Sequence, residues 1–270
     1  MSIYLMAVLI IGGGLTLCLL GILLARRLAG LHFTEEHWHV AGYIQQIMGT
    51  LYAVLIAFAV VTAWQRHRDA QAVAEAEANN LNDAFRFAQG LSMPQRDEFR
   101  RTLVDYGRNV IEEEWPLLGT GREGPKTRAA YRHTWDLISV MDPATERDKA
   151  LYAAILKELD DLSDEHRQRI LFSEARLDGI LWFSLIVGGL LTVGFSFFFG
   201  LKHLGRQAFM TAFFAGIILL NLFVIAALDR PFSGPSAIQP RIMRFVVERM
   251  QANLDGRPQE DPPPPASGGR

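Results

Sequence analysis

Four long stretches without any charged residue constrain the fold of this chain more than any other feature. Each contains 21–22 residues, so as a helix rising about 1.5 Å per residue it would reach a little over 30 Å, enough to cross a bilayer core. The stretches are Ile3–Leu24, Tyr43–Trp64, Ile180–Leu201 and Ala208–Leu228. The rest of the chain carries all 27 basic and 29 acidic side chains and is roughly 30 % charged, against about 25 % in soluble proteins. This division predicts a membrane protein and excludes an ordinary soluble enzyme.

The first stretch has no basic residues before it and is followed directly by Arg26 and Arg27, so we expect a retained span and not a cleaved signal peptide. The predicted fold class is an all-α membrane protein, with four transmembrane helices and an extramembrane helical bundle inserted between the second and third spans. The expected divisions are a first transmembrane hairpin at 1–64 (spans about 3–24 and 43–64), an extramembrane helical domain at 65–179, a second transmembrane hairpin at 180–228 (spans about 180–201 and 208–228), a post-membrane segment at 229–254 and a disordered Pro-rich tail at 255–270.

The segment between the second and third spans has helical patterns throughout. Gln65–Gln89 contains neither Gly nor Pro, so one long helix is expected to leave the membrane. Ser92 and Pro94 predict the start of the next helix, which we expect to stop at Trp115–Pro116. Asp142–Pro143 is predicted to cap the last helix of the domain. That helix carries apolar residues at alternating three- and four-residue spacing: Tyr152, Ile155, Leu159 and Leu162.

The distribution of charge bears on partners and on orientation. A net charge of −2 with no dense Lys/Arg run argues against a nucleic-acid partner. Eight arginines, Arg169 among them, flank the spans on the domain side against four basic residues on the other side, which favours a cytoplasmic domain and cytoplasmic termini. Without the flanks of the long domain the count becomes three against four, so the orientation is only weakly favoured. The single cysteine, Cys18, lies in the first span and excludes an intramolecular disulfide.

The loop after the first span is the one candidate metal site. Its imidazoles and carboxylates are His32, Glu35, Glu36, His37 and His39. His37 and His39 would face different sides of a helix, so we favour a polar interfacial segment anchored by Trp38, and metal binding stays open.

Other polar motifs have ordinary interpretations. Gly119–Gly124 matches G-x-G-x-x-G, but no strand precedes it and Pro125 follows it, so a flexible loop is expected. The acidic residues of Glu112–Glu114 and of Asp160–Glu165 fit solvated helix faces better than a cation site. No nucleophile–base pair is evident, so we predict neither an enzyme nor a bound cofactor.

Two spans carry stripes of small residues. Such stripes let helix backbones approach closely, and their hydroxyls can bond across the interface, so helix packing is the favoured role. A pore lining is the alternative for the third span, although no charge accompanies its stripe. The helix-packing candidates are Gly49, Ala53 and Ala57 on the second span, and Ser184, Gly188, Thr192 and Ser196 on the third.

One residue along from its small-residue stripe, the second span presents Thr50, Val54 and Phe58, with Gln46 at the entrance. A ring of apolar side chains around a symmetry axis can gate ions by dewetting, and an amide at the mouth tolerates a partly hydrated ion. These four residues are the candidate pore lining. Exposure of Val54 and Phe58 to lipid is an equally weighted alternative.

Several strings together resemble the bacterial bestrophin-like family of four-span membrane proteins, a domain of unknown function. They are Leu51–Leu55, Glu75–Ala78, Tyr106, Glu114–Pro116 and Leu228–Gly234, and the resemblance covers roughly Ala41 to Gly234. The residues that carry it are Tyr52, Glu77, Tyr106, Glu114, Trp115, Asp229, Arg230, Pro231 and Phe232.

The resemblance implies a distant similarity to bestrophin anion channels, in which subunits surround an axial pore and the second span forms an apolar neck. It places Gln46, Thr50, Val54 and Phe58 toward such a pore. The chain lacks the Pro-containing, Phe-rich neck string of true bestrophins and any counterpart of their acidic calcium clasp, so neither selectivity nor calcium gating carries over.

Two hypotheses follow. The first is a homo-oligomeric channel that passes small inorganic anions, spans a bacterial inner membrane several times and contacts membrane lipid. The second is a non-conducting membrane sensor or scaffold whose helical domain binds a partner.

Overall fold

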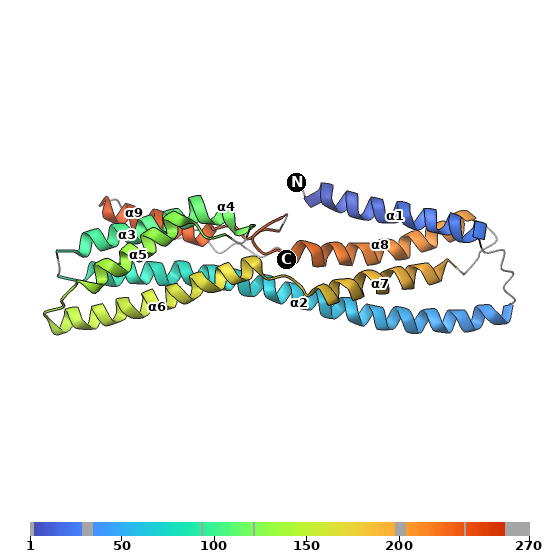
Figure 1. Cartoon of the computed structure of the whole chain (residues 1–270), viewed down its shortest axis with the longest axis horizontal. Helices are drawn as coiled ribbons and strands as arrows, with labels where there is room; N and C mark the ends of the chain where they lie inside the picture. Colours follow the sequence, from blue (N-terminus) through green and yellow to red (C-terminus); the bar gives the residue numbers. More distant parts are fainter. Residues whose placement is uncertain are drawn as a thin grey trace. The chain divides into compact units, whose positions relative to one another are not determined.

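The computed structural model describes residues 3–28, 35–92, 94–120, 122–197, 204–234 and 236–256. Within these ranges every regular element is a helix, so the predicted all-α class is confirmed there (Figure 1). Contacts divide the chain into two compact units, and each is described by itself. We call them the apolar unit (Met1–His67, Arg176–Arg230 and Gly234–Ser236) and the polar unit (Arg68–Ala175, Pro231–Ser233 and Ala237–Arg270).

The apolar unit consists of α1 (Ile3–Leu28), the first part of α2 (Glu35–Gln89), α7 (Gly179–Ser196) and α8 (Leu204–Leu228). Helix α1 lies beside α8 (Figure 1), and Gly14 permits this approach, because a Cβ there would lie 2.6 Å from Leu219 Cδ1. The buried residues between α2, α7 and α8 include Tyr52, Ile56, Leu185 and Ile218.

Three helical stretches among the described residues are long and apolar enough to cross a membrane. They are Val40–Gln89, Glu146–Ser196 and Gly205–Leu228, and a shorter apolar helix covers Ile10–Leu24. The predicted presence of helices long and apolar enough to span a membrane is therefore confirmed, in agreement with a membrane protein.

The polar unit contains the rest of α2, α3 (Arg96–Asn109), the π-helical turn η1 (Val110–Glu114), α4 (Trp115–Leu118), α5 (Pro125–Ser139), α6 (Glu146–Glu174) and α9 (Arg241–Leu254). Its core is built from stripes such as Phe99, Leu103 and Val110 on α3–η1 and Ile155 and Leu159 on α6. The post-membrane segment supplies α9, whose Met243, Val246, Val247 and Met250 are buried in the same core.

Three predicted helix boundaries are wrong. Helix α3 begins at Arg96, with Gln95 as its N-cap residue, and not at Ser92 and Pro94. The helix does not stop at Trp115–Pro116 but continues to Leu118, because η1 lies directly before the proline. In this wider turn the Trp115 N–H donates to the Val110 carbonyl five residues back, which relieves the clash that a proline ring makes in a regular α-helix. Thr145, and not Asp142–Pro143, caps α6: its hydroxyl accepts the Asp148 N–H at 3.0 Å.

Candidate functional site

The candidate pore lining lies on the uncovered face of α2. Gln46, Thr50, Val54 and Phe58 are exposed, and the exposed fractions of Val54 and Phe58 are 50 % and 70 %. The Thr50 hydroxyl donates to the Gln46 carbonyl of its own helix at 2.9 Å. The opposite face of α2 is buried, at Tyr52, Ile56, Ala59 and Ala63. The helix thus has one packed face and one face that no described part of the chain covers.

The small residues Gly49, Ala53 and Ala57 border a groove of about 480 Å³ that α7 and α8 complete with Thr192 and Phe214. A Cβ added at Gly49 would meet nothing within 4 Å. The proposed packing role of these three residues stays a prediction.

The small-residue stripe of α7 faces Tyr52 at its centre. A Cβ at Gly188 would lie 2.9 Å from Tyr52 Cδ2, and the Tyr52 hydroxyl donates to the Leu185 carbonyl at 2.7 Å. The Thr192 carbonyl accepts a hydrogen bond from Gln45 Nε2 at 3.2 Å. The Ser184 and Ser196 hydroxyls instead donate to carbonyls of their own helix, at 2.9 and 2.5 Å.

The last motif string is anchored at both ends. Asp229, which follows α8, accepts the Leu177 N–H at 2.6 Å and the Trp182 indole N–H at 3.2 Å, so it ties the end of α8 to the start of α7 within the apolar unit. Phe232 packs edge-on against Trp115 in the polar unit, with ring centroids 5.6 Å apart. Arg230 is exposed and Pro231 is buried.

A buried ionic cluster occupies the core of the polar unit. Glu77 from α2, Glu114 from η1 and Arg169 from α6 are each 0 % exposed. Arg169 Nε donates to Glu77 Oε2 at 2.5 Å, and Nη2 donates to Glu77 Oε1 at 3.0 Å and to Glu114 Oε1 at 2.6 Å. One guanidinium thus bridges two carboxylates. Its two bonds to Glu77 form a bidentate pair, a geometry that the planar guanidinium of arginine favours.

Tyr106 and His166 complete this cluster. The Tyr106 hydroxyl donates to Glu77 Oε1 at 2.6 Å, and His166 Nδ1 lies 3.4 Å from Glu77 Oε1 and 3.5 Å from Glu114 Oε1. The Tyr131 ring stacks on the imidazole, and the Trp115 ring centroid lies 5.3 Å from Arg169 Cζ. Aromatic rings therefore shield the cluster from water.

The cluster alters the acidity of its members. Burial alone would raise the pKa of Glu77, but the charge of Arg169 and hydrogen bonds from His166 and Arg169 outweigh it and lower that pKa from 4.5 to about 2. Burial and the neighbouring Glu77 carboxylate raise the pKa of the Tyr106 phenol. Both carboxyl and phenol thus keep their ordinary charge states at neutral pH.

The family model of the Bestrophin-like domain matches residues 12–243. The chain belongs to the bestrophin-like family. The resemblance inferred from the motif strings is thereby confirmed.

Solved structures share the fold of this bestrophin-like protein. A crystal structure of a mutant bacterial Bestrophin homolog from Klebsiella pneumoniae aligns with a TM-score of 0.70 at 14 % identity, covering 92 % of this chain and 99 % of that one. A second structure of that homolog, solved by Zn-SAD phasing, gives 0.69 at 14 % identity and covers 91 % and 98 %. A mutant described as a membrane protein gives 0.67 at 12 % identity and covers 93 % and 99 %. No curated protein matches the sequence significantly.

The cluster gathers four of the family-motif residues, Glu77, Tyr106, Glu114 and Trp115, although they are far apart in sequence. One of them corrects an expectation: Glu114 does not lie on a solvated face, because it continues the buried stripe of Tyr106 and Val110 and finds a counter-charge inside. Arg169 was also misassigned, since an arginine buried against two carboxylates is not a membrane-flanking charge.

Sequence reasoning missed His166 and Arg169 as site residues, although a signal was present. The buried positions of α6 alternate by four and three residues, and His166 and Arg169 continue this spacing beyond Leu162. The full series is Ile155, Leu159, Leu162, His166 and Arg169. Charged or titratable residues at such positions indicate a buried polar network.

The loop considered as a candidate metal site falls largely outside what the structure describes. His32 lies outside the described residues, and the side chains of residues 35–39 are also outside them. The described residues contain no group of three or more His, Cys, Asp or Glu side chains that could hold a metal. In the glycine-rich loop, the Gly124 N–H donates to Glu114 Oε2 at 3.2 Å, so this loop serves the ionic cluster.

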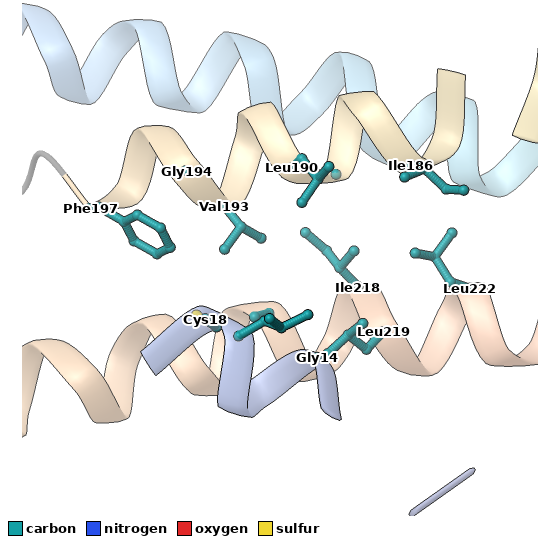
Figure 2. Close-up of a pocket in the computed structure, with 13 residues that line it drawn as sticks. Gly14, Cys18, Ile186, Leu190, Val193, Gly194, Phe197, Ile218, Leu219 and Leu222 are labelled. Carbon is teal, nitrogen blue, oxygen red and sulfur yellow. The ribbon is translucent and has the colours of Figure 1, made fainter. Parts of the chain in front are cut away.

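A second candidate cavity lies in the apolar unit (Figure 2). It has a volume of about 280 Å³ and is lined by α1, α7 and α8, with Cys18, Leu190, Val193 and Ile218 at its walls. Its lining contains no charged group and no amide or hydroxyl side chain. Such a surface offers a permeating ion nothing to replace its hydration shell, so we place no ion pathway there.

Proposed function

We propose that this bestrophin-like protein is a homo-oligomeric channel for small inorganic anions in a bacterial inner membrane. The chain crosses the membrane four times in this proposal, with the polar unit and both termini in the cytoplasm. The observation that carries it is the uncovered face of α2, where Gln46, Thr50, Val54 and Phe58 form one continuous exposed row. Family membership supports the same arrangement, because the resemblance to bestrophins implies a second span beside an axial pore.

Oligomerisation is required by the chemistry of the helices. The exposed row lies on the outside of the chain, and a hydrated path arises only when copies bring their rows together around an axis. In that arrangement Val54 and Phe58 form the apolar constriction, and Gln46 provides amides at its mouth. Tyr43–Trp64 contains no charged residue, so any positive charge that attracts anions has to lie outside this part of the span.

The deciding experiment is anion flux into liposomes that contain the purified protein or its Phe58→Ala variant. We expect flux to rise in the variant, because a smaller side chain widens and wets an apolar constriction. Phe213→Ala on α8 is the matched control, since Phe213 is also exposed (67 %) but lies on another helix, and its flux should equal that of the parent protein.

Two results would contradict the proposal. A monomeric mass in detergent and in lipid would remove the axis on which the pore depends. An absence of flux from all three proteins, with insertion confirmed, would favour the alternative of a sensor or scaffold.

A further inference from the structure

We propose that His166 makes the ionic cluster a proton-binding site, so that the packing of the polar unit depends on pH. The inference is independent of conduction and rests on a charge imbalance. Glu77 and Glu114 bring two negative charges into a region that is 0 % exposed, and Arg169 brings one positive charge. With both carboxylates ionised, the cluster is neutral when the imidazole of His166 carries a second positive charge.

The groups that face His166 come from every element packed around it. Nδ1 lies 3.2 Å from the Tyr106 hydroxyl of α3 and 3.2 Å from Arg169 Nη2 of its own helix, beside the carboxylates of α2 and η1. Tyr131 of α5 stacks on the ring, with its hydroxyl 2.5 Å from Ser163 Oγ. The neighbouring Glu165 has a buried Oε2 without a partner among the described residues, and burial followed by the charge of Glu77 raises the pKa of that carboxyl.

The cluster has enough hydrogen-bond donors, but it has too little positive charge to balance its two carboxylates. The one proton of Tyr106 is directed to Glu77, and Arg169 Nη2 already faces both carboxylates. Arg169 Nη1 is buried and has no hydrogen-bond partner in the described part of the chain, so the guanidinium has a donor to spare. Of the described groups in contact with both carboxylates, the imidazole is therefore the one that can add charge.

Protons can reach this site from solvent, because the His166 side chain is 18 % exposed while both carboxylates are 0 % exposed. Loss of the proton leaves one buried carboxylate uncompensated, which weakens the packing of α6 against α2 and η1. The stabilisation is therefore present while the imidazole is charged, and it is lost as the pH rises and the imidazole becomes neutral.

The test is thermal unfolding of the full chain in detergent at about pH 5.5 and about pH 8, followed by tryptophan fluorescence. We expect the parent protein to melt roughly 2–4 °C lower at the higher pH, and the His166→Gln variant to show no such difference. His133→Gln is the matched control, because His133 is 53 % exposed on α5 and lies outside the cluster; it should keep the parent behaviour.

A charge-balance variant separates this proposal from a purely structural role for the ring. Glu114→Gln removes the excess negative charge, so it should restore much of the melting temperature lost in His166→Gln when the two substitutions are combined. Glu114→Gln alone should abolish the pH difference even if His166→Gln does not fold. Retention of the pH difference in His166→Gln or Glu114→Gln, or a double variant less stable than His166→Gln, would overturn the inference.

Discussion

The apolar and polar units solve opposite problems of burial. In the apolar unit, large apolar side chains such as Phe58, Leu190 and Phe209 are more than half exposed, while a small group of buried residues packs around Tyr52. In the polar unit, Glu77, Glu114 and Arg169 are fully buried, and the outer surface carries exposed ion pairs such as Lys157–Asp161. The first unit needs lipid or further copies outside it, and the second needs its internal charges to match one another.

The largest expected loss of stability comes from removing the buried guanidinium that pairs with Glu77 and Glu114. Arg169→Ala leaves two buried carboxylates without their guanidinium, and we expect the polar unit to lose about 3–5 kcal/mol of unfolding free energy. Denaturant unfolding measures the loss. Arg167→Ala is the matched control two residues away, since its pair with Asp164 is exposed and should contribute less than about 1 kcal/mol. Equal losses in the two variants would show that the buried ion pairs of Arg169 contribute no more to stability than the exposed pair of Arg167.

Low pH should destabilise the polar unit in particular, because Glu77, the buried carboxylate whose pKa is strongly lowered, belongs to that unit. Its folded-state pKa is about 2 against an ordinary 4.5, so its stabilisation is complete above about pH 4.5 and is lost as the pH falls toward 2. The loss is on the order of 3 kcal/mol. Melting curves of the parent protein and of Glu77→Gln across this range measure it, and parallel acid profiles would contradict the assignment.

A smaller effect tests the apolar unit, where packing and not charge decides. Gly188→Ala places a methyl group 2.9 Å from the Tyr52 ring, which is held by its bond to the Leu185 carbonyl, so we expect a loss of about 1–3 kcal/mol. Gly194→Ala on the same helix is the control, because its new methyl would meet nothing within 4 Å. Thermal stability in detergent distinguishes the two, and indifference at Gly188 would mean that the Tyr52 ring moves freely.

Much of the fold could be predicted because local patterns encode it. Charge-free stretches predict apolar helices whatever their partners, and the helix from Val40 to Gln89 follows from an unbroken run without proline. Helix ends were less certain. The π-helical turn before Pro116 and the Thr145 cap depend on how neighbouring turns accommodate one residue, and hydropathy periodicity does not report this.

The candidate site likewise has a part that helical periodicity predicts and a part that depends on contacts between different helices. Helical periodicity placed Thr50, Val54 and Phe58 on one face of α2, and the structure leaves that face uncovered. Periodicity on α3 and α6 also leads to the positions of Glu114, His166 and Arg169, but it indicates no partner for them. A charged residue at such a position is stable inside the protein only when an opposite charge lies beside it, and periodicity along one helix does not report what lies on another.

The sequence by itself determined that the chain is a helical membrane protein with a charged helical segment, because bilayer thickness and helical rise set the length of every apolar span. It also determined the family, because the short motif strings can be recognised in the linear sequence without knowledge of the fold. Only the tertiary structure decided that Glu77, Glu114 and Arg169 meet, because they lie on three elements far apart in the chain. Burial of a charge is favourable only when its partner arrives from elsewhere in the fold.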